Sequence, residues 1–285
     1  MKKSNILSQY AKNVVSQNGE DGIIERILEI LPNTNNWCVE FGAWDGKYLS
    51  NCYNLISNLG WNGVMIEGNS NKYRQLQQTY KGNEKTYLFN RFVNFTGKNS
   101  LDNILQSTPI PIDFDILSID IDGNDYHIWD SLKIFMPKVV IIEFNPTIPS
   151  DIAFVQERNI DVSHGSSLLS LNILGISKGY ELIGTTLCNA IFVKKEYFSL
   201  FGIENNSPSI LWDTEGEAPR VFQLFDGTIV LSKGFNLIWK NVKVDTYDLQ
   251  KIPKYFRFNH DYQNIYGLFK AILFKVIKKI VYNFK

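Results

Sequence analysis

The sequence predicts an α/β protein built on a doubly wound, mostly parallel sheet. Short apolar stretches alternate with segments of helical spacing along most of residues 19–195, which is the order expected of such a sheet. The run KVVIIEF (138–144) is continuously apolar and β-branched, as in strands that are buried on both faces. Two further strands, ELIGTT (181–186) and NAIFVKK (189–195), are close enough in the chain to form an antiparallel pair that closes the sheet.

Each element follows from its local pattern. A helix is expected over 19–31, because isoleucines and leucines recur at helical spacing and Pro32 then ends it. Further helices are expected over 50–59, 71–80, 100–105 and 166–180. The remaining strands are predicted within WCVEFGAWDG (37–46), GVMIEGN (63–69), YLFNRFVNF (87–95) and FDILSID (114–120).

Three parts of the chain are distinguished. Residues 1–195 form the predicted sheet domain, and 196–261 are an aromatic-rich extension whose fold the pattern does not predict. Residues 262–285 form a basic amphipathic helix, which would either lie in a membrane interface or pack on protein. Lysines interrupt every apolar run there, so a membrane-spanning helix is not expected.

Composition excludes several classes of protein. The chain has 285 residues with 29 basic and 29 acidic side chains, so no overall positive charge favours binding to nucleic acid. Its three cysteines, Cys38, Cys52 and Cys188, have no metal-type spacing and are read as reduced thiols. The N-terminus lacks the apolar region of a signal peptide. We therefore expect a cytoplasmic protein, with peripheral contact to the inner face of a membrane if the C-terminal helix binds lipid.

Acidic and small residues stand at the carboxyl ends of two of the predicted strands. In open α/β sheets this is where ligands bind. Glu40 and Gly42 end the first strand, with Asp45 just after, and Glu67 ends the second. Glycine would allow close approach to the backbone, and a carboxylate 21 residues past Gly46 suits the two hydroxyls of a ribose. This combination predicts a nucleoside cofactor, although each residue alone would also fit an ordinary turn or surface charge.

Several motifs occur in a familiar order: SQNGEDGIIERIL, WCVEFGAWDG, GVMIEGN, SIDIDGNDYHIW, VVIIEFNP and GSSLLSLNILGISKGYELIGTT followed by NAIFV. Over residues 14–195 the chain resembles FkbM-like class I S-adenosylmethionine-dependent methyltransferases. The resemblance implies a Rossmann-like sheet of seven strands with the last one antiparallel. It also implies an S-adenosylmethionine (SAM) site with Glu40 and Gly42 at the methionine part, Glu67 on the ribose and Asp102 near the adenine. Asp45 and Asp120 are expected to line the same site.

The stretch SIDIDGNDY (118–126) places three aspartates within six residues, and such a cluster requires a cation or other partners. Asp120 and Asp122 follow the fourth strand, and Glu143 and Asn145 follow the fifth. Their oxygen atoms would suit Mg²⁺ or Mn²⁺, which would bind substrate hydroxyls. A carboxylate base without metal is an equal alternative, and capping of turns by Asp120, Asp125 and Asn145 is a third.

The predicted activity is O-methylation of a hydroxyl on a sugar or glycoconjugate, which could be linked to a lipid or nucleotide. The sugar is implied by the family resemblance alone. Asp122, Glu143 and His164 are the candidate proton acceptors, in that order. Gln17, Gly19, Glu20 and Asp21 would either close over the cofactor or cap a helix.

Two other functions remain open. Asp120-Ile121-Asp122 is a D-x-D, as in glycosyltransferases that hold a nucleotide-sugar through Mn²⁺, but that function leaves Glu40, Gly42 and Glu67 unused. A scaffold that keeps the sheet without catalysis is the second alternative. An NAD-linked oxidoreductase is disfavoured, because GAWDG lacks the G-x-G-x-x-G spacing.

Overall fold

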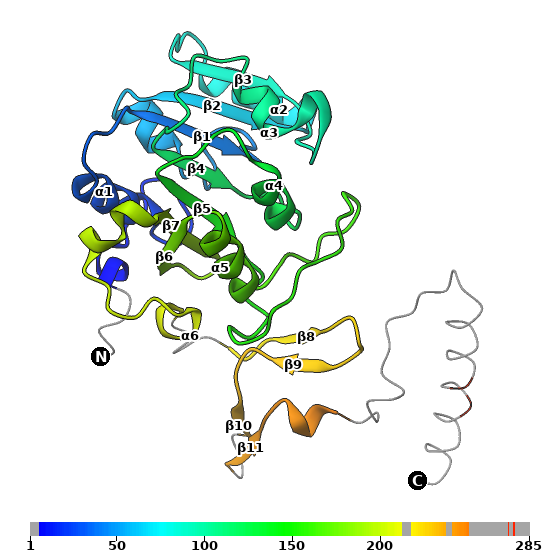
Figure 1. The fold of residues 1–285 in the computed structure, drawn as a ribbon. Coiled ribbons are helices and arrows are strands. Elements are labelled where there is room, and N and C mark those ends of the chain that lie inside the picture. The colour runs from blue at the N-terminus through cyan, green and yellow to red at the C-terminus, as the bar shows by residue number, and fades with distance from the viewer. Residues whose placement is uncertain (1–5, 213–217, 238–240, 251–272, 274–275, 277–285) are drawn as a thin grey trace. The chain divides into compact units, whose positions relative to one another are not determined.

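The computed structural model describes residues 6–212, 218–237, 241–250, 273 and 276. The chain forms two compact units (Figure 1). The first lies within residues 1–146 and 150–215, and the second within 147–149 and 216–285. The predicted helix at 262–285 falls outside the described residues, apart from 273 and 276, so its membrane contact stays a prediction. Among the described helices, none is both long enough and apolar enough to cross a bilayer.

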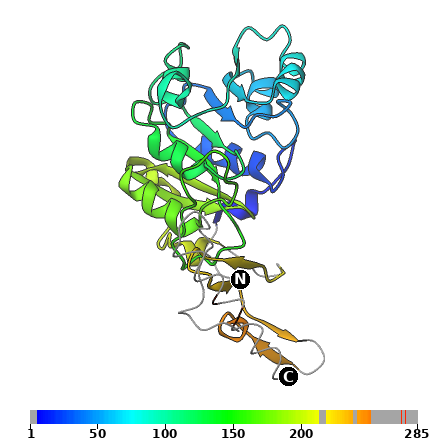
Figure 2. The same ribbon diagram turned by 90° about the vertical axis from the view of Figure 1, so that its right-hand side faces the viewer.

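The first unit is built on a seven-stranded sheet in the order β3-β2-β1-β4-β5-β7-β6 (Figures 1 and 2). Strands β1 to β5 are parallel, and β7 runs antiparallel to both of its neighbours. This confirms the predicted fold class. The strands are β1 (Trp37–Phe41), β2 (Asn62–Glu67), β3 (Thr86–Asn90), β4 (Ile116–Ile119), β5 (Val139–Glu143), β6 (Tyr180–Thr185) and β7 (Asn189–Lys194).

Helices cover both faces of this sheet. Apolar side chains of α1 (Glu20–Ile30), α2 (Ser70–Thr79) and the π-helical turn Asn54–Asn58 share one core cluster with alternate strand residues such as Cys38, Met65 and Ile141. Side chains of α3 (Leu101–Leu105), α4 (Asp125–Ser131) and α5 (Leu168–Ser177) share another with Val39, Ile66 and others. Successive strand residues point to opposite faces, so apolar strands such as β5 are buried on both.

Two elements are shorter than predicted. The strand expected over 87–95 ends at Asn90, which is the register partner of Glu67, the last residue of β2. Residues 91–95 are not part of a strand. The helix expected over 50–59 is reduced to the π-helical turn.

The first unit extends beyond the predicted boundary at residue 195. It includes a 3-10 helix, Lys195–Phe201, and the short α6, Pro208–Leu211. Leu211 and Trp212 are part of the sheet's core, and the Trp212 ring meets Phe144 edge-on with centroids 5.3 Å apart. Short 3-10 helices also occur at Ile6–Tyr10 and Gly97–Asn99.

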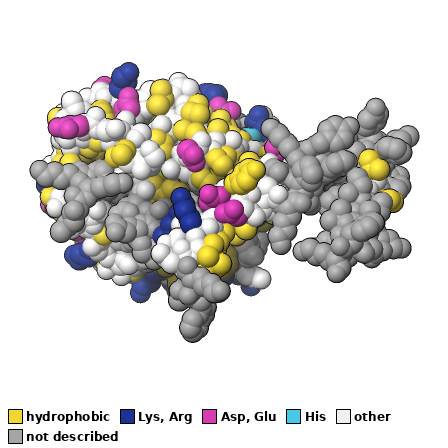
Figure 3. Space-filling view, turned by 90° about the horizontal axis from the view of Figure 1, so that it is seen from below, with side chains coloured by type: hydrophobic (Ala, Val, Ile, Leu, Met, Phe, Trp, Pro, Cys, Tyr) yellow, Lys and Arg dark blue, Asp and Glu magenta, His cyan; other side chains and the backbone are white. Residues whose placement is uncertain are grey.

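The second unit contains two antiparallel pairs of strands. Strand β8 (Val221–Gln223) pairs with β9 (Ile229–Leu231), and β10 (Phe235–Leu237) pairs with β11 (Val242–Val244). A 3-10 helix, Tyr247–Leu249, follows. The face of the molecule seen in Figure 3 shows acidic and basic side chains interspersed where residues are described, in keeping with the zero net charge of the chain.

Candidate active site

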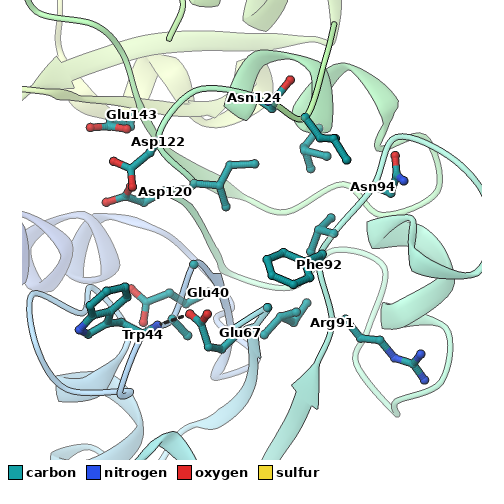
Figure 4. A pocket seen from close by; sticks show the side chains of 18 of the residues that line it. Glu40, Trp44, Glu67, Arg91, Phe92, Asn94, Asp120, Asp122, Asn124 and Glu143 are labelled. Carbon is teal, nitrogen blue, oxygen red and sulfur yellow. Dashed lines mark hydrogen bonds between the residues drawn. The ribbon is translucent and has the colours of Figure 1, made fainter. Parts of the chain in front are cut away.

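A cavity of about 920 Å³ lies in the first unit at the carboxyl ends of the parallel strands. Its lining includes Glu40 and Gly42 from the end of β1, Glu67 from β2 and Glu143 from β5. Asp120 and Asp122, which follow β4, also line it. The acids expected at the rim of the sheet therefore share one hollow, where Figure 4 shows them facing a common space.

Glu67 is held by the two turns beside it. Its Oε2 accepts the backbone N–H of Trp44 at 2.8 Å (Figure 4), and its Oε1 accepts that of Asn69 at 2.6 Å. Only 6% of the residue is exposed. Each carboxylate oxygen has two lone pairs, so one on each oxygen remains for a ligand. The residue thus has a fixed orientation and the capacity for bidentate bonding to two hydroxyls.

Gly42 is required by the fold as well as by the cavity. Its φ of +76° is a left-handed conformation that favours glycine. A Cβ atom there would overlap the carbonyl oxygen of Asp120, which follows the neighbouring strand β4. The sequence predicts that a ligand approaches the backbone of Gly42 closely. In the structure the carbonyl of Asp120 makes this close approach, and the contact brings the ends of β1 and β4 together.

Glu40 is buried, with 5% of its surface exposed. Its carboxylate accepts hydrogen bonds from the Ser50 hydroxyl and from the backbone N–H of Asn51, the latter at 2.8 Å. Burial raises the pKa of Glu40 to about 7, although these bonds act in the opposite direction. Near neutral pH the carboxyl group of Glu40 is therefore partly protonated and partly ionised, and a cationic ligand nearby would favour the ionised form.

Asp125, the third aspartate of SIDIDGNDY, is separated from the other two by its partners. Its Oδ1 accepts the backbone N–H of Ile121 at 3.0 Å, and its Oδ2 accepts that of Gly123 at 2.9 Å. It is the first residue of α4, whose N-cap is Asn124. Burial raises its pKa to about 7. Asp125 therefore secures the turn that carries Asp122, a role closer to the capping alternative than to catalysis.

The other two aspartates form an open cluster with Glu143. One ligand oxygen from each of Asp120, Asp122 and Glu143 lies within 4.8 Å of the others. Burial, then the charge of Asp122, raises the pKa of Asp120 to about 6, while burial and the neighbouring aspartates raise that of Glu143 to about 9. Three carboxylates so close together are not all ionised without a cation. Their hard oxygen atoms fit Mg²⁺ or Mn²⁺.

The backbone at Asp122 is itself unusual. Its φ is +55°, a left-handed conformation uncommon for residues other than glycine, and Gly123 follows with a φ of +147°. The Asn124 amide also ties this turn to a distant loop by donating to the carbonyls of Asn159 and Val162 at 3.0 and 3.2 Å. Asp122 is thus held in the cavity by a tight turn with two independent restraints.

Four predicted site residues do not line the cavity. Asp45 accepts the backbone N–H groups of Lys47 and Tyr48, which makes it a turn-forming residue. Asp102 was expected near an adenine, and this role stays a prediction, because the residue is outside the cavity lining. Its carboxylate instead accepts three backbone N–H groups, those of residues 133–135, at 2.8 to 3.2 Å.

His164 and Asn145 are the other two. The backbone N–H of His164 donates to Gln156 Oε1 at 2.9 Å, and its carbonyl accepts the Asn145 amide at 2.6 Å. Both residues are therefore engaged in a loop beside the cavity. The structure brings neither of them into the group formed by Asp120, Asp122 and Glu143.

Several residues of the lining were not predicted. Exposed apolar side chains surround it: Trp44, Tyr48, Leu49, Phe92 and Ile160. Their only sequence signal is an aromatic or aliphatic residue in a polar loop. Among the described lining residues, the charged groups are six carboxylates and Arg91, which Figure 4 places on the side away from Glu143.

Comparisons with known proteins find similarity only among solved structures. No family model matches the chain, and no curated protein matches it. The citrinin polyketide synthase CMeT domain is 13% identical with a TM-score of 0.40, covering 66% of this chain and 55% of that one. A SAM-dependent methyltransferase from Aquifex aeolicus is 10% identical with a TM-score of 0.38, covering 66% and 96%.

An O-methyltransferase family protein from Burkholderia thailandensis is 9% identical with a TM-score of 0.38, covering 61% of this chain and 57% of that one. The chain thus spans little more than half the length of two of these three proteins. Similarity at this level does not transfer an activity, and membership in the FkbM-like family is not confirmed.

Proposed function

We propose that this chain is an FkbM-like, SAM-dependent O-methyltransferase acting on a hydroxyl of a sugar or glycoconjugate. The observation that carries the proposal is the shared cavity at the strand ends, lined by Glu40, Glu67 and Asp120. In an open α/β sheet this edge is where ligands bind. If any of these three acids lay outside the cavity, the proposal would lose its basis.

Glu67 would hold the ribose of the donor. Its carboxylate is oriented by Trp44 and Asn69 and keeps lone pairs on both oxygens. Glu40, whose pKa of about 7 reflects burial without a cation, would gain its charge when an ammonium group binds nearby. The bound donor supplies an electrophilic methyl group, so the chain's own task is to orient an oxygen and remove its proton.

Asp122 and Glu143 would do this on the acceptor side. Asp122, restrained by its turn, would receive the proton from the acceptor hydroxyl. Glu143, with a pKa raised to about 9, would be largely protonated at neutral pH unless a cation is present. A divalent ion held by Asp120, Asp122 and Glu143 would keep all three ionised and would lower the pKa of a bound hydroxyl.

The sugar assignment is supported by the family resemblance and by the aromatic rim. Tyr48 and Phe92 are 64% and 75% exposed beside the cavity. Aromatic faces exposed at a polar site suit the apolar face of a sugar ring. Six lining carboxylates against one arginine also favour a neutral or cationic reacting end over one that carries phosphate.

Binding measurements test the donor site. We expect S-adenosylhomocysteine, the demethylated product of SAM, to bind the purified chain in isothermal titration and Glu67→Gln to weaken it at least tenfold. Glu84→Gln, an exposed glutamate outside the cavity, is the matched control and should not change the affinity. Binding of a nucleotide-sugar with Mn²⁺, and none of S-adenosylhomocysteine, would favour the glycosyltransferase instead. Cofactor binding without methyl transfer to any cell-envelope extract would favour the scaffold.

The metal is tested separately. Titration of Mn²⁺ into the wild-type chain should show one site that is lost in Asp122→Asn and kept in Asp130→Asn, a surface control on α4. Binding of S-adenosylhomocysteine should survive chelation, because Glu67 lies apart from the acidic cluster. If Mn²⁺ does not bind, Asp122 would act as a base without metal.

A further inference from the structure

The loop that precedes α1 is held by several hydrogen bonds. Asp21 Oδ2 accepts the backbone N–H groups of Val14, Val15 and Ser16 at 2.7, 2.9 and 2.9 Å. The residue is only 2% exposed. Three converging N–H groups hold a buried carboxylate firmly, and in return the carboxylate fixes the course of the loop.

A second set of bonds closes the other half of this loop. Asn13 Oδ1 accepts the backbone N–H of Gly19 at 2.5 Å and the Ser16 hydroxyl at 3.0 Å. The Asn13 amide donates to the carbonyl of Gln17 at 3.1 Å, and the Lys12 N–H donates to the carbonyl of Gly19 at 3.2 Å. The backbone is therefore restrained on both sides of Gln17.

The side chain of Gln17 differs from the restrained backbone on either side of it. Its residue is exposed and lines the cavity. Within the part of the chain that the structure describes, its side-chain amide makes no hydrogen bond. The next residue, Asn18, is engaged through its amide with Cys188 Sγ at 3.6 Å and through its backbone with Glu20. The restrained loop thus offers one unused amide to the cavity.

Contacts of Glu20 show which end of the cavity receives this amide. Glu20 Oε1 accepts the Thr186 hydroxyl at 2.8 Å and the Asn189 amide at 3.0 Å. Asn189 is the register partner of Glu143 on β5. The loop is therefore anchored near the end of β5, with β1 and β4 between it and Glu67 on β2.

The donor's amino-acid part carries a carboxylate, which needs an N–H donor in a cavity lined mainly by acids. Among the described lining residues, the amides of Asn51 and Asn124 already donate, to Ser118 and to loop carbonyls. Asn94 lies on the side away from Glu143 (Figure 4), and Asn99 is joined to it by a backbone hydrogen bond of 2.9 Å. Arg91 lies on the opposite side, next to β3 (Figure 4). Among the amide side chains of the described lining, Gln17 is left as the donor on the side of β5.

We propose that Gln17 recognises the α-carboxylate of the donor through its amide N–H, an inference that rests on the proposed function. A donor whose ribose is bound at Glu67 would extend along the strand ends past β1 toward β4, bringing its amino-acid end to the Gln17 loop. Because the loop is already ordered, the hydrogen bond forms without further ordering of the backbone.

Two ligands separate this role from general damage to the site. S-adenosylhomocysteine has the amino-acid part, and 5′-methylthioadenosine has the same adenosyl thioether without it. By isothermal titration on the full chain, Gln17→Ala should weaken the first ligand about tenfold, or 1.4 kcal/mol, and leave the second unchanged. Glu67→Gln should weaken both. Gln77→Ala, an exposed glutamine on α2 outside the cavity, is the matched control and should weaken neither.

Gln17→Glu gives a second measurement with little change in size. A carboxylate facing a carboxylate should weaken S-adenosylhomocysteine more than Gln17→Ala does, again without affecting 5′-methylthioadenosine. Equal losses for both ligands, or no loss for S-adenosylhomocysteine, would overturn the role of Gln17 while leaving the proposed function intact. A wild-type chain that binds neither ligand would overturn both.

Discussion

Replacing Gly42 by alanine tests how closely the ends of β1 and β4 approach each other. The left-handed φ of +76° costs an alanine about 1–2 kcal/mol. The new Cβ would also overlap the Asp120 carbonyl, so one of the two strand ends must shift. Forced backbone shifts of this kind cost about 1–3 kcal/mol more. The free energy of unfolding should therefore fall by roughly 2–5 kcal/mol.

Gly82→Ala provides the matched control. Gly82 has a φ of +81° but nothing within 4 Å of its would-be Cβ. It should lose only the conformational part, about 1–2 kcal/mol. Both changes also reduce the freedom of the unfolded chain equally, so that contribution cancels in the comparison.

Urea denaturation of the two variants and the wild type measures these differences, and titration with S-adenosylhomocysteine adds a functional readout. Gly42→Ala should bind more weakly than Gly82→Ala, because the shift displaces Asp120 at the cavity wall. Equal destabilisation of the two variants would refute the close approach of β1 and β4 on which the shape of the cavity depends.

Three further predictions concern single side chains. Lys138→Met should cost about 3–5 kcal/mol in urea denaturation without altering ligand affinity, because it leaves Asp115 buried without its cation at the far end of the strands. Burial raises the pKa of Glu40 from 4.5 to about 7. The contribution of protonated Glu40 to the stability of the folded state is therefore present below pH 4.5 and lost as pH rises to 7. In denaturation at several pH values, the free energy of unfolding of Glu40→Gln should rise relative to that of the wild type by up to about 3 kcal/mol across that interval. Asp102→Ala should lower stability by about 1–2 kcal/mol and keep ligand affinity, whereas weaker binding would support the adenine role.

The sheet and its acidic rim were predictable because both depend on local patterns. Apolar β-branched runs such as 138–144 predict buried parallel strands, and parallel strands bring their carboxyl ends to one edge. Glu40, Glu67 and Asp122 could therefore be expected to meet before any contact was known. The antiparallel position of β7 followed from the short connection after β6.

Asp102 and His164 show where this reasoning ends. An aspartate at a helix start can face a ligand or accept unpaired N–H groups, and here the groups come from residues 133–135, about thirty positions away. His164 is placed by Gln156, a buried side chain in a loop without periodicity. Both outcomes depend on loop paths, which hydrophobic patterns do not encode.

The bonds from Asn124 to the carbonyls of residues 159 and 162 have a consequence for engineering. Exchanging that stretch would also remove the anchors of the turn bearing Asp122. Under the proposed function, acceptor selectivity and reactivity would be linked through this loop, and a transplanted loop would need to supply two carbonyls in the same places to hold the turn of Asp122.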